Sequence, residues 1–180
     1  MALKKTSETV MISDLIDIDT GFTTNEITLP LDILNREVFV ITGVDFQVGS
    51  NIALSRITSY GDIRARVSNT RPSALPNLSN SNCVAALDFS WASHFVPAGG
   101  VPGSEIPSFS GMEQLSGNTP PADMDYIGIV ATDNMYISQD LDGTLGSGNA
   151  GTVQVRVYGY RAQADAATYA GLVQSEALSA

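Results

Sequence analysis

Apolar and polar residues alternate along the stretch 36–49, and this pattern predicts a long β-strand. One face of that strand is apolar throughout, and the other face is apolar at Phe39 and Ile41 but polar at Asp45 and Gln47. Successive side chains of a strand point to opposite sides of the sheet. The pattern therefore predicts a central strand that is covered on both faces at one end only. Its fully apolar face consists of Val38, Val40, Thr42, Val44, Phe46 and Val48.

Further strands are predicted wherever β-branched and aromatic residues recur between turn residues. The clearest is 152–160, where Val153, Val155 and Val157 alternate with polar residues and are expected to face the core. A turn at Gly61-Asp62 predicts a hairpin between 52–60 and 63–67. The segment 27–34 is expected to be a strand that ends near Pro30 and a short turn into the long strand. The other expected strands are 83–91, 126–131 and 135–139. The inward residues of 83–91 are expected to be Cys83, Ala85, Leu87, Phe89 and Trp91.

Glycine, proline and serine concentrate in the segments between the strands. We expect 68–82 to be a loop and 140–151 to be a glycine-rich hairpin loop. The segment 97–122 is rich in proline and glycine and has little periodicity. A connection of that length in a compact domain usually carries function, although a plain surface excursion also fits.

The two ends of the chain differ from the middle. We expect residues 1–24 to form an arm with short apolar runs that lies along the body of the protein or along a neighbour. Its candidate assembly contacts are Met11, Ile12, Leu15 and Ile16. Residues 165–178 have a helical period with Asp165 as N-cap. Its apolar face adds Tyr169, Leu172 and Val173 as further candidate contacts, because arm and tail each look too small to bury their apolar residues alone.

Together these segments predict an all-β fold in a single domain of 180 residues. About seven or eight strands with long loops indicate a two-sheet antiparallel β-sandwich, either a jelly roll or a related Greek key. The expected division is an N-terminal arm at 1–24, a β-sandwich domain at 25–163 and a C-terminal helical tail at 164–180.

Composition narrows the range of functions. A net charge of −10 with nine basic residues argues against nucleic-acid binding, which needs clustered Lys and Arg. We expect neither a membrane span nor a secretory signal, and we therefore expect the protein to be made in the cytoplasm. Cys83, His94 and Trp91 are the single residues of their kinds, so one chain offers no disulfide and no zinc site of several His or Cys ligands.

No residue pattern predicts catalysis, and we expect a protein that is not an enzyme. Asp123 and Asp125 precede a strand after two prolines, where turn chemistry explains them better than an acid–base pair does. Arg64 and Arg66 share one strand face, which we interpret as solvated.

Acidic residues leave one metal hypothesis open. Asp140 and Asp142 begin a loop that resembles a calcium site, but it lacks the further acidic residues of an EF-hand, so a plain loop is the better interpretation. Asp17 and Asp19 could bind calcium at a subunit contact, although solvated carboxylates explain them more simply. No other cofactor is expected.

Aromatic residues gather near the long segment 97–122. Trp91, His94, Phe95 and Phe109 could stack on sugars or on another subunit, and contact with a like subunit requires fewer coincidences.

The layout of the chain resembles that of single jelly-roll capsid proteins of viruses. The shared features are a polar arm, strands separated by loops rich in Pro, Gly and Ser, and a last strand at 152–160 that leads into a short tail. The arm offers only Lys4 and Lys5, whereas the arms of RNA-virus members are often basic. The resemblance implies a shell component that leaves the genome's charge to other molecules.

The sequence therefore predicts a structural virion protein that assembles with copies of itself into a capsid shell. Other virion proteins are further expected partners, and the virion is the expected location. The alternative is a carbohydrate-binding or adhesion β-sandwich module, including a virion decoration protein. That alternative predicts a groove lined by Trp91 and tyrosines.

Overall fold

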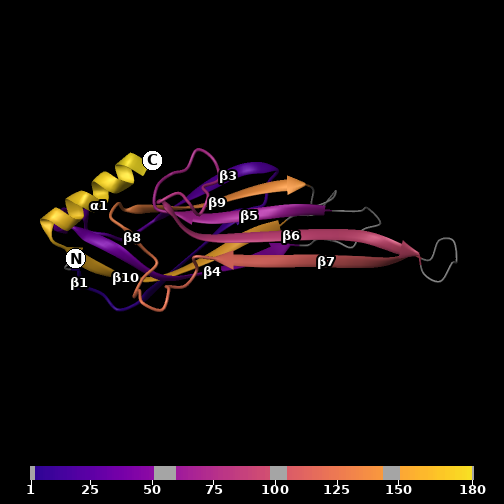
Figure 1. The fold of residues 1–180 in the computed structure, drawn as a ribbon. Helices are drawn as coiled ribbons and strands as arrows, with labels where there is room; N and C mark the ends of the chain where they lie inside the picture. Colours follow the sequence, from indigo (N-terminus) through magenta and orange to yellow (C-terminus); the bar gives the residue numbers. More distant parts are fainter. Residues whose placement is uncertain (1–2, 51–59, 98–104, 144–150, 180) are drawn as a thin grey trace.

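The computed structural model describes residues 3–50, 60–97, 105–143 and 151–179. Side chains are described in these ranges except at Ser50, 93–97, 105–109 and Ser179. Two antiparallel sheets of five strands each pack face to face (Figure 1). The first sheet contains β1 (Leu3–Lys5), β2 (Val10–Asp17), β4 (Glu37–Ser50), β8 (Gly128–Val130) and β10 (Gly151–Ala164). The second contains β3 (Gly21–Thr28), β5 (Tyr60–Ser68), β6 (Cys83–Pro97), β7 (Glu105–Ser116) and β9 (Asn134–Gly143).

The strands pair in a nested order, first with last. β2 pairs with β10, β3 with β9, β4 with β8 and β5 with β6, all antiparallel. The order across the first sheet is β2-β10-β4-β8, and across the second it is β3-β9-β5-β6 with β7 added beyond β6. This is an eight-stranded jelly roll with two additional strands, β1 and β7. The all-β sandwich predicted from the sequence is thus confirmed, and the more specific of its two topologies is the one found.

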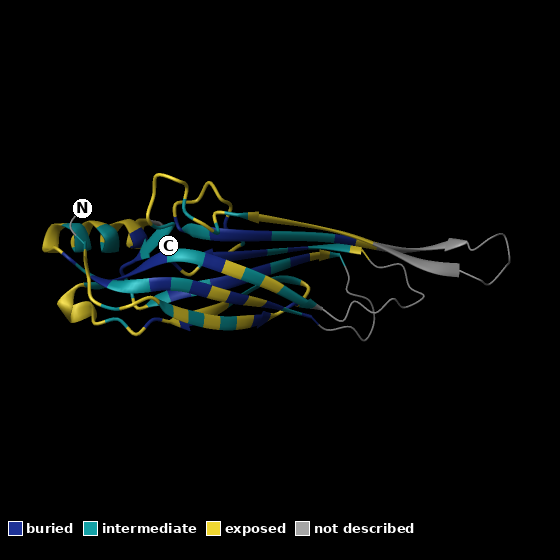
Figure 2. Ribbon diagram, turned by 90° about the horizontal axis from the view of Figure 1, so that it is seen from below, coloured by how far each residue is buried: buried dark blue, intermediate teal, exposed yellow. Residues whose placement is uncertain are grey.

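The main core lies between the sheets. Val153, Val155 and Val157 of β10 face it as predicted, opposite Leu87 and Trp91 of β6. Alternating burial along the strands is visible in Figure 2, where dark blue positions recur on the strands of both sheets. Aliphatic burial of this extent is the main stabilising contribution expected in a sandwich.

A β-bulge divides the long strand β4 into two parts. Tyr158 pairs with Gly43 and Gly159 pairs with Ile41, so Thr42 is the extra residue. On one side of it Phe39 and Ile41 face the main core, and on the other side Val44 does. The prediction of one continuous apolar face from Val38 to Val48 is therefore wrong. A bulge inserts one residue and reverses the side on which all later side chains lie.

A second, smaller core lies on the other side of the first sheet, against the part of β4 that precedes the bulge. Val38 and Val40 point away from the main core and pack with Ala131, Ala162 and Ala164. Helix α1 (Ala166–Ser179) covers them with its apolar side chains, so the predicted helical tail is confirmed as a helix. No helix among the described residues is long and apolar enough to cross a membrane.

Residues 3–24 lie along the body of the protein, one of the two placements expected for the arm, but they form sheet strands rather than a separate arm. β1 and β2 lie end to end along one side of β10, and β3 forms an edge of the second sheet. The strands in this segment were not predicted because an edge strand with one solvent-exposed face contains few apolar residues. In β2 only the inward positions Val10, Ile12 and Ile16 contribute to the core.

Two further predictions are corrected. β5 runs without a turn through Gly61 and Asp62, while 51–59 lie outside the described residues. The glycine is needed there because a Cβ at residue 61 would collide with the ring of Trp91. Within the predicted loop 97–122, β7 forms a long strand beside β6. A 3-10 turn (η1, Ile33–Asn35) leads into β4.

Candidate functional site

Strand β7 is an open edge of the second sheet. It pairs with β6 from Ser116 opposite Ala86 to Glu105 opposite Pro97, with no register shift. No second neighbour pairs with β7 among the described residues. Its side chains from Ser110 to Leu115 are all exposed, including Met112 at 67% and Leu115 at 50%. An edge of this kind presents unpaired main-chain groups and apolar side chains together.

The outer part of the β6–β7 pair extends beyond the rest of the sandwich. β5 accompanies β6 only as far as Ala92, opposite Tyr60. Beyond that point, 93–97 and 105–109 pair only with each other among the described residues. Figure 1 shows these two strands running past the ends of their neighbours. A two-stranded ribbon is at best marginally stable in water, so contact with a partner would stabilise this one.

The predicted recognition aromatics do not form one exposed group. Trp91 is 3% exposed and belongs to the main core, stacked with Phe89 at 6.0 Å between ring centroids. Its proposed role in recognition is wrong, although its predicted inward direction is confirmed. His94 and Phe95 lie on β6 and Phe109 on β7, in strands rather than in a loop. Their side chains lie outside the described ones.

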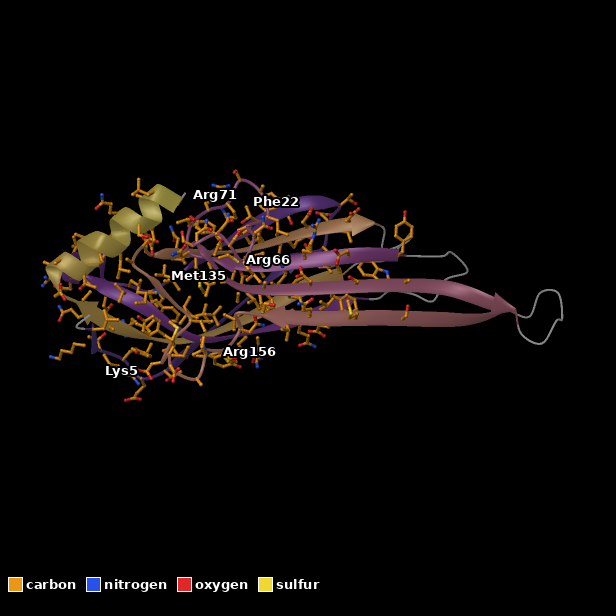
Figure 3. The ribbon with its side chains drawn as sticks, viewed as in Figure 1. Lys5, Phe22, Arg66, Arg71, Met135 and Arg156 are labelled. Carbon is orange, nitrogen blue, oxygen red and sulfur yellow. The ribbon has the colours of Figure 1, made fainter. Side chains whose placement is uncertain are left out.

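A groove of about 660 Å³ crosses the first sheet. Its lining follows the strand register in three rows, each with one residue from β2, β10 and β4. Leu115 of β7 completes it beside β4. In the outer rows the side chains of Arg156 and Gln154 point away from the core, as Figure 3 shows for Arg156. The rows are Ser13–Arg156–Asp45, Asp14–Val155–Phe46 and Leu15–Gln154–Gln47.

The chemistry of the groove is mixed. Arg156, Gln47 and Gln154 provide hydrogen-bond donors, and the exposed Leu15 and Leu115 provide apolar surface. The Tyr158 hydroxyl donates to the Asp45 carboxylate at 2.9 Å and holds it in place. The lining contains neither Trp nor Tyr, so the groove expected for a sugar-binding module, with Trp91 in its wall, is not the groove found.

The seven predicted assembly contacts divide into three groups. Met11 and Leu15 are 56% and 50% exposed on the outer side of β2, where a neighbour could reach them. Ile12 is half-buried against the main core and Ile16 is buried in it. Tyr169, Leu172 and Val173 pack on Val38 and its neighbours within the same chain. The premise that the tail cannot bury its apolar face alone is therefore wrong.

The four acidic candidates for calcium lie apart or have other partners. Asp140 forms a 2.6 Å ion pair with Arg64, opposite it in the sheet. Asp142, Asp17 and Asp19 are exposed. Among the described residues no three His, Cys, Asp or Glu side chains come together as a metal site. The part of the loop at 144–150 lies outside the described residues.

Arg66 is a buried cation, so the prediction of a solvated side chain is wrong for it. It is 7% exposed, and its Nη1 lies 2.8 Å from Asp88 Oδ1 and donates to the Leu87 carbonyl at 2.9 Å. Its Nε donates to the Pro76 carbonyl at 3.2 Å. Arg66 therefore fastens the loop 69–82 onto the outer side of the second sheet (Figure 3). The alternation of residues along the strand does not predict that the loop 69–82 covers Arg66.

Glu176 is a second buried charge that the sequence did not reveal. It is 4% exposed, and its carboxylate accepts hydrogen bonds from the main-chain N–H groups of Ala131 and Thr132, at 2.8 and 3.1 Å. Burial raises the pKa of Glu176, and the two N–H donors offset part of that effect. The contact fixes the last turn of α1 to the β8–β9 connection.

Cys83 is half-buried at the start of β6, and burial raises the pKa of its thiol. A raised pKa keeps the thiol protonated at neutral pH, where it is a weak nucleophile. We therefore interpret Cys83 as a small, half-buried apolar residue and not as a nucleophile.

Comparison with known proteins finds only distant structural likenesses. No protein family model and no curated protein matches the chain. Among solved structures it is similar to Merkel Cell Polyomavirus VP1 in an unassembled pentamer, with 8% identity over 91% of this chain and 99% of that one, and a TM-score of 0.41. It is similar to the tailspike protein of Acinetobacter baumannii phage AM24 with 10% identity and a TM-score of 0.18, over 84% of this chain and 27% of that one.

These two likenesses are too distant to assign a function. The assignment of the fold rests on the nested strand pairing described above. The jelly roll is the architecture expected from the resemblance of the sequence layout to single jelly-roll viral capsid proteins, and it also occurs in lectin domains and cupins.

Proposed function

We propose that the protein is a structural virion protein, a subunit that assembles with copies of itself into a capsid shell. The supporting observation is the β6–β7 extension, a two-stranded ribbon with an open outer edge on a jelly roll. Exposed Met112 and Leu115 on that edge, and Met11 and Leu15 on β2, add apolar surface at two separate places. A shell subunit needs several such places, because each copy contacts more than one neighbour.

The proposal assigns no catalytic residue to the chain. Its partners are copies of itself and, secondarily, other virion proteins, and its location is the virion after synthesis in the host cytoplasm. Calcium bound by Asp17 and Asp19 at a subunit contact is retained as a minor element of the proposal. The net charge of −10 favours a shell that does not neutralise the genome directly.

The test is the size of the purified protein, measured by light scattering and electron microscopy with and without calcium. We expect closed particles or large ordered oligomers. Replacing Met11 and Leu15 together by Ser should reduce assembly and leave thermal unfolding of the subunit unchanged. Leu34→Ser is the matched control, because Leu34 is 92% exposed on η1 and away from both surfaces. A subunit that stays monomeric when concentrated, in every buffer, contradicts the proposal.

A carbohydrate-binding module is the second candidate, and the groove across the first sheet favours it. Arg156, Gln47 and Gln154 are donors suited to the hydroxyls and carboxylates of a sugar. The absence of Trp and Tyr from the lining makes this candidate the weaker one, since sugar rings commonly stack on aromatic faces. A monomer that binds a glycan array, with binding lost in Arg156→Ala, would favour it over the shell.

A further inference from the structure

We propose that β7 pairs antiparallel with β7 of a second copy, about a two-fold axis that passes through Met112. The pairing would join the two five-stranded sheets into one continuous sheet. This inference rests on the proposed function, since it names one contact by which subunits assemble. It is independent of the shape of the final particle.

β7 is the long accessible edge of the sandwich. β8, one edge of the first sheet, has only three residues. β2 forms the other edge of the first sheet together with β1 and has eight residues. It is tied to β3, the other edge of the second sheet, by the Asn25 side chain, which donates to the Leu15 carbonyl at 3.1 Å. β7 has twelve residues, paired with β6 without a bulge. A partner strand can therefore add to it over most of its length.

The features that usually block such an edge are missing from most of β7. Natural edge strands carry lysines, prolines or bulges that prevent a second strand from pairing. The stretch 108–116 contains no Lys, Arg or Pro, and Glu113 is its single charge. The described side chains at 110–115 are all exposed, so no other part of the described chain covers them.

The sequence of β7 selects a second copy as occupant and selects the register. A two-fold axis perpendicular to the sheet through residue 112 places Met112 opposite the same residue of the second copy. It also places Glu113 opposite Gly111 and Gln114 opposite Ser110. Moving the axis to residue 113 would place two carboxylates face to face, which is destabilising. The axis at Met112 joins two exposed apolar side chains and separates the two Glu113 carboxylates.

The register can be tested by cysteine cross-linking in a Cys83→Ser background. Met112→Cys should form a disulfide-linked dimer under mild oxidation, because residues on the axis face each other. Met124→Cys is the matched control, since Met124 is an exposed methionine outside the strand and should cross-link far less. A Met112→Cys protein that cross-links no better than Met124→Cys overturns the inference.

A mixture gives the sharper test. Ser110→Cys and Gln114→Cys proteins should each remain uncross-linked alone and should form a mixed disulfide dimer when combined. Cross-linking of either protein alone, at the level of the mixture, would show a different register and overturn the proposal. Met112→Lys should weaken the contact by about tenfold, because it places two like charges on the axis, and should leave thermal unfolding unchanged.

The outcomes separate this inference from the proposed function. Particles that form while Met112→Cys stays uncross-linked overturn the β7 pairing and leave the shell proposal standing. Cross-linked dimers that never grow further support the β7 pairing and contradict the shell. A protein that neither assembles nor cross-links contradicts both.

Discussion

Glu176, in the last turn of α1, accepts a 2.8 Å hydrogen bond from the main-chain N–H of Ala131 at the end of β8. The second carboxylate oxygen accepts from Thr132, so one side chain serves two neighbouring amides. This contact joins the C-terminal helix to the connection between the two sheets.

Removal of this contact should destabilise the protein. Glu176→Ala leaves the amides of Ala131 and Thr132 without their acceptor, one of them in a buried position. We expect the free energy of unfolding to fall by about 2–3 kcal/mol. Chemical denaturation followed by circular dichroism measures it. The control is Gln174→Ala on the same helix, which should leave stability unchanged because Gln174 is exposed.

The same carboxyl predicts a pH dependence. Burial raises the pKa of Glu176, so the folded state binds the proton more tightly than the unfolded state does. Its contribution is then fully present below the ordinary Glu pKa and is lost as pH rises through the folded pKa. Lowering the pH from neutrality should stabilise the wild type relative to Glu176→Gln, which does not titrate. Denaturation curves of both proteins at several pH values measure the difference, and a constant difference contradicts the assignment.

Asp165, at the other end of α1, should show the opposite sign. Its carboxylate accepts hydrogen bonds from the N–H and hydroxyl of Thr168, both at 2.8 Å, and the N–H bond lowers the pKa of Asp165. Its contribution is therefore present above the ordinary Asp pKa and is lost as pH falls through the folded pKa. Asp165→Ala should lower the melting temperature at neutral pH and make less difference in acid. Asp165→Asn, which still caps the helix, should retain most of the stability at both pH values.

Two arginines on one strand provide a matched pair. Arg66→Met removes a buried cation with four partners and leaves the Asp88 carboxylate without its counter-ion. We expect a loss of about 3 kcal/mol in the free energy of unfolding. Arg64→Met removes the ion pair of a half-exposed side chain with Asp140 and should cost less than about 1 kcal/mol. Equal losses would show that the cover over Arg66 contributes nothing.

Two glycines should respond to alanine with opposite signs, one beside the bulge in β4 and one on helix α1. A Cβ at residue 159 would collide with the Val40 carbonyl and the Phe39 ring, beside the bulge at Thr42. Gly159→Ala should therefore destabilise the protein by about 1–3 kcal/mol or more. Gly171 lies on the exposed side of α1, and nothing lies within 4 Å of the position of its Cβ. Gly171→Ala should stabilise the protein by about 0.5–1 kcal/mol, because alanine favours the helix. Thermal unfolding of both variants checks the opposite signs.

The sequence pattern predicts those parts of the fold in which local periodicity and burial agree. The alternation of Val153, Val155 and Val157 predicts β10, and the helical period after Asp165 predicts α1. Both follow from side chains that repeat along a single element. A residue such as Thr42 breaks the alternation, but its own type does not reveal whether it lies in a bulge.

The missed features depend on contacts between distant segments. β7 contains Gly, Ser and Pro and reads as loop, yet β6 supplies main-chain partners along its whole length. Gly61 suggests a turn in the sequence, but a glycine is required there because the ring of Trp91 on the next strand leaves no room for a side chain. The burial of Arg66 and Glu176 depends on a loop and a helix that fold over them, which no local pattern encodes. For the same reason the β6–β7 extension itself was not predicted, although His94, Phe95 and Phe109 lie on it.

Leu3 lies opposite Ala164 in the first sheet, and α1 begins two residues later, so both chain ends lie remote from the β6–β7 extension (Figure 1). Fluorescent dyes attached at either terminus would consequently sit at the far extremes of a pair of copies joined through β7. Energy transfer between such dyes should be weak, whereas dyes placed near the joined strands should report the union strongly. Fusion partners could be carried at these ends without obstructing it.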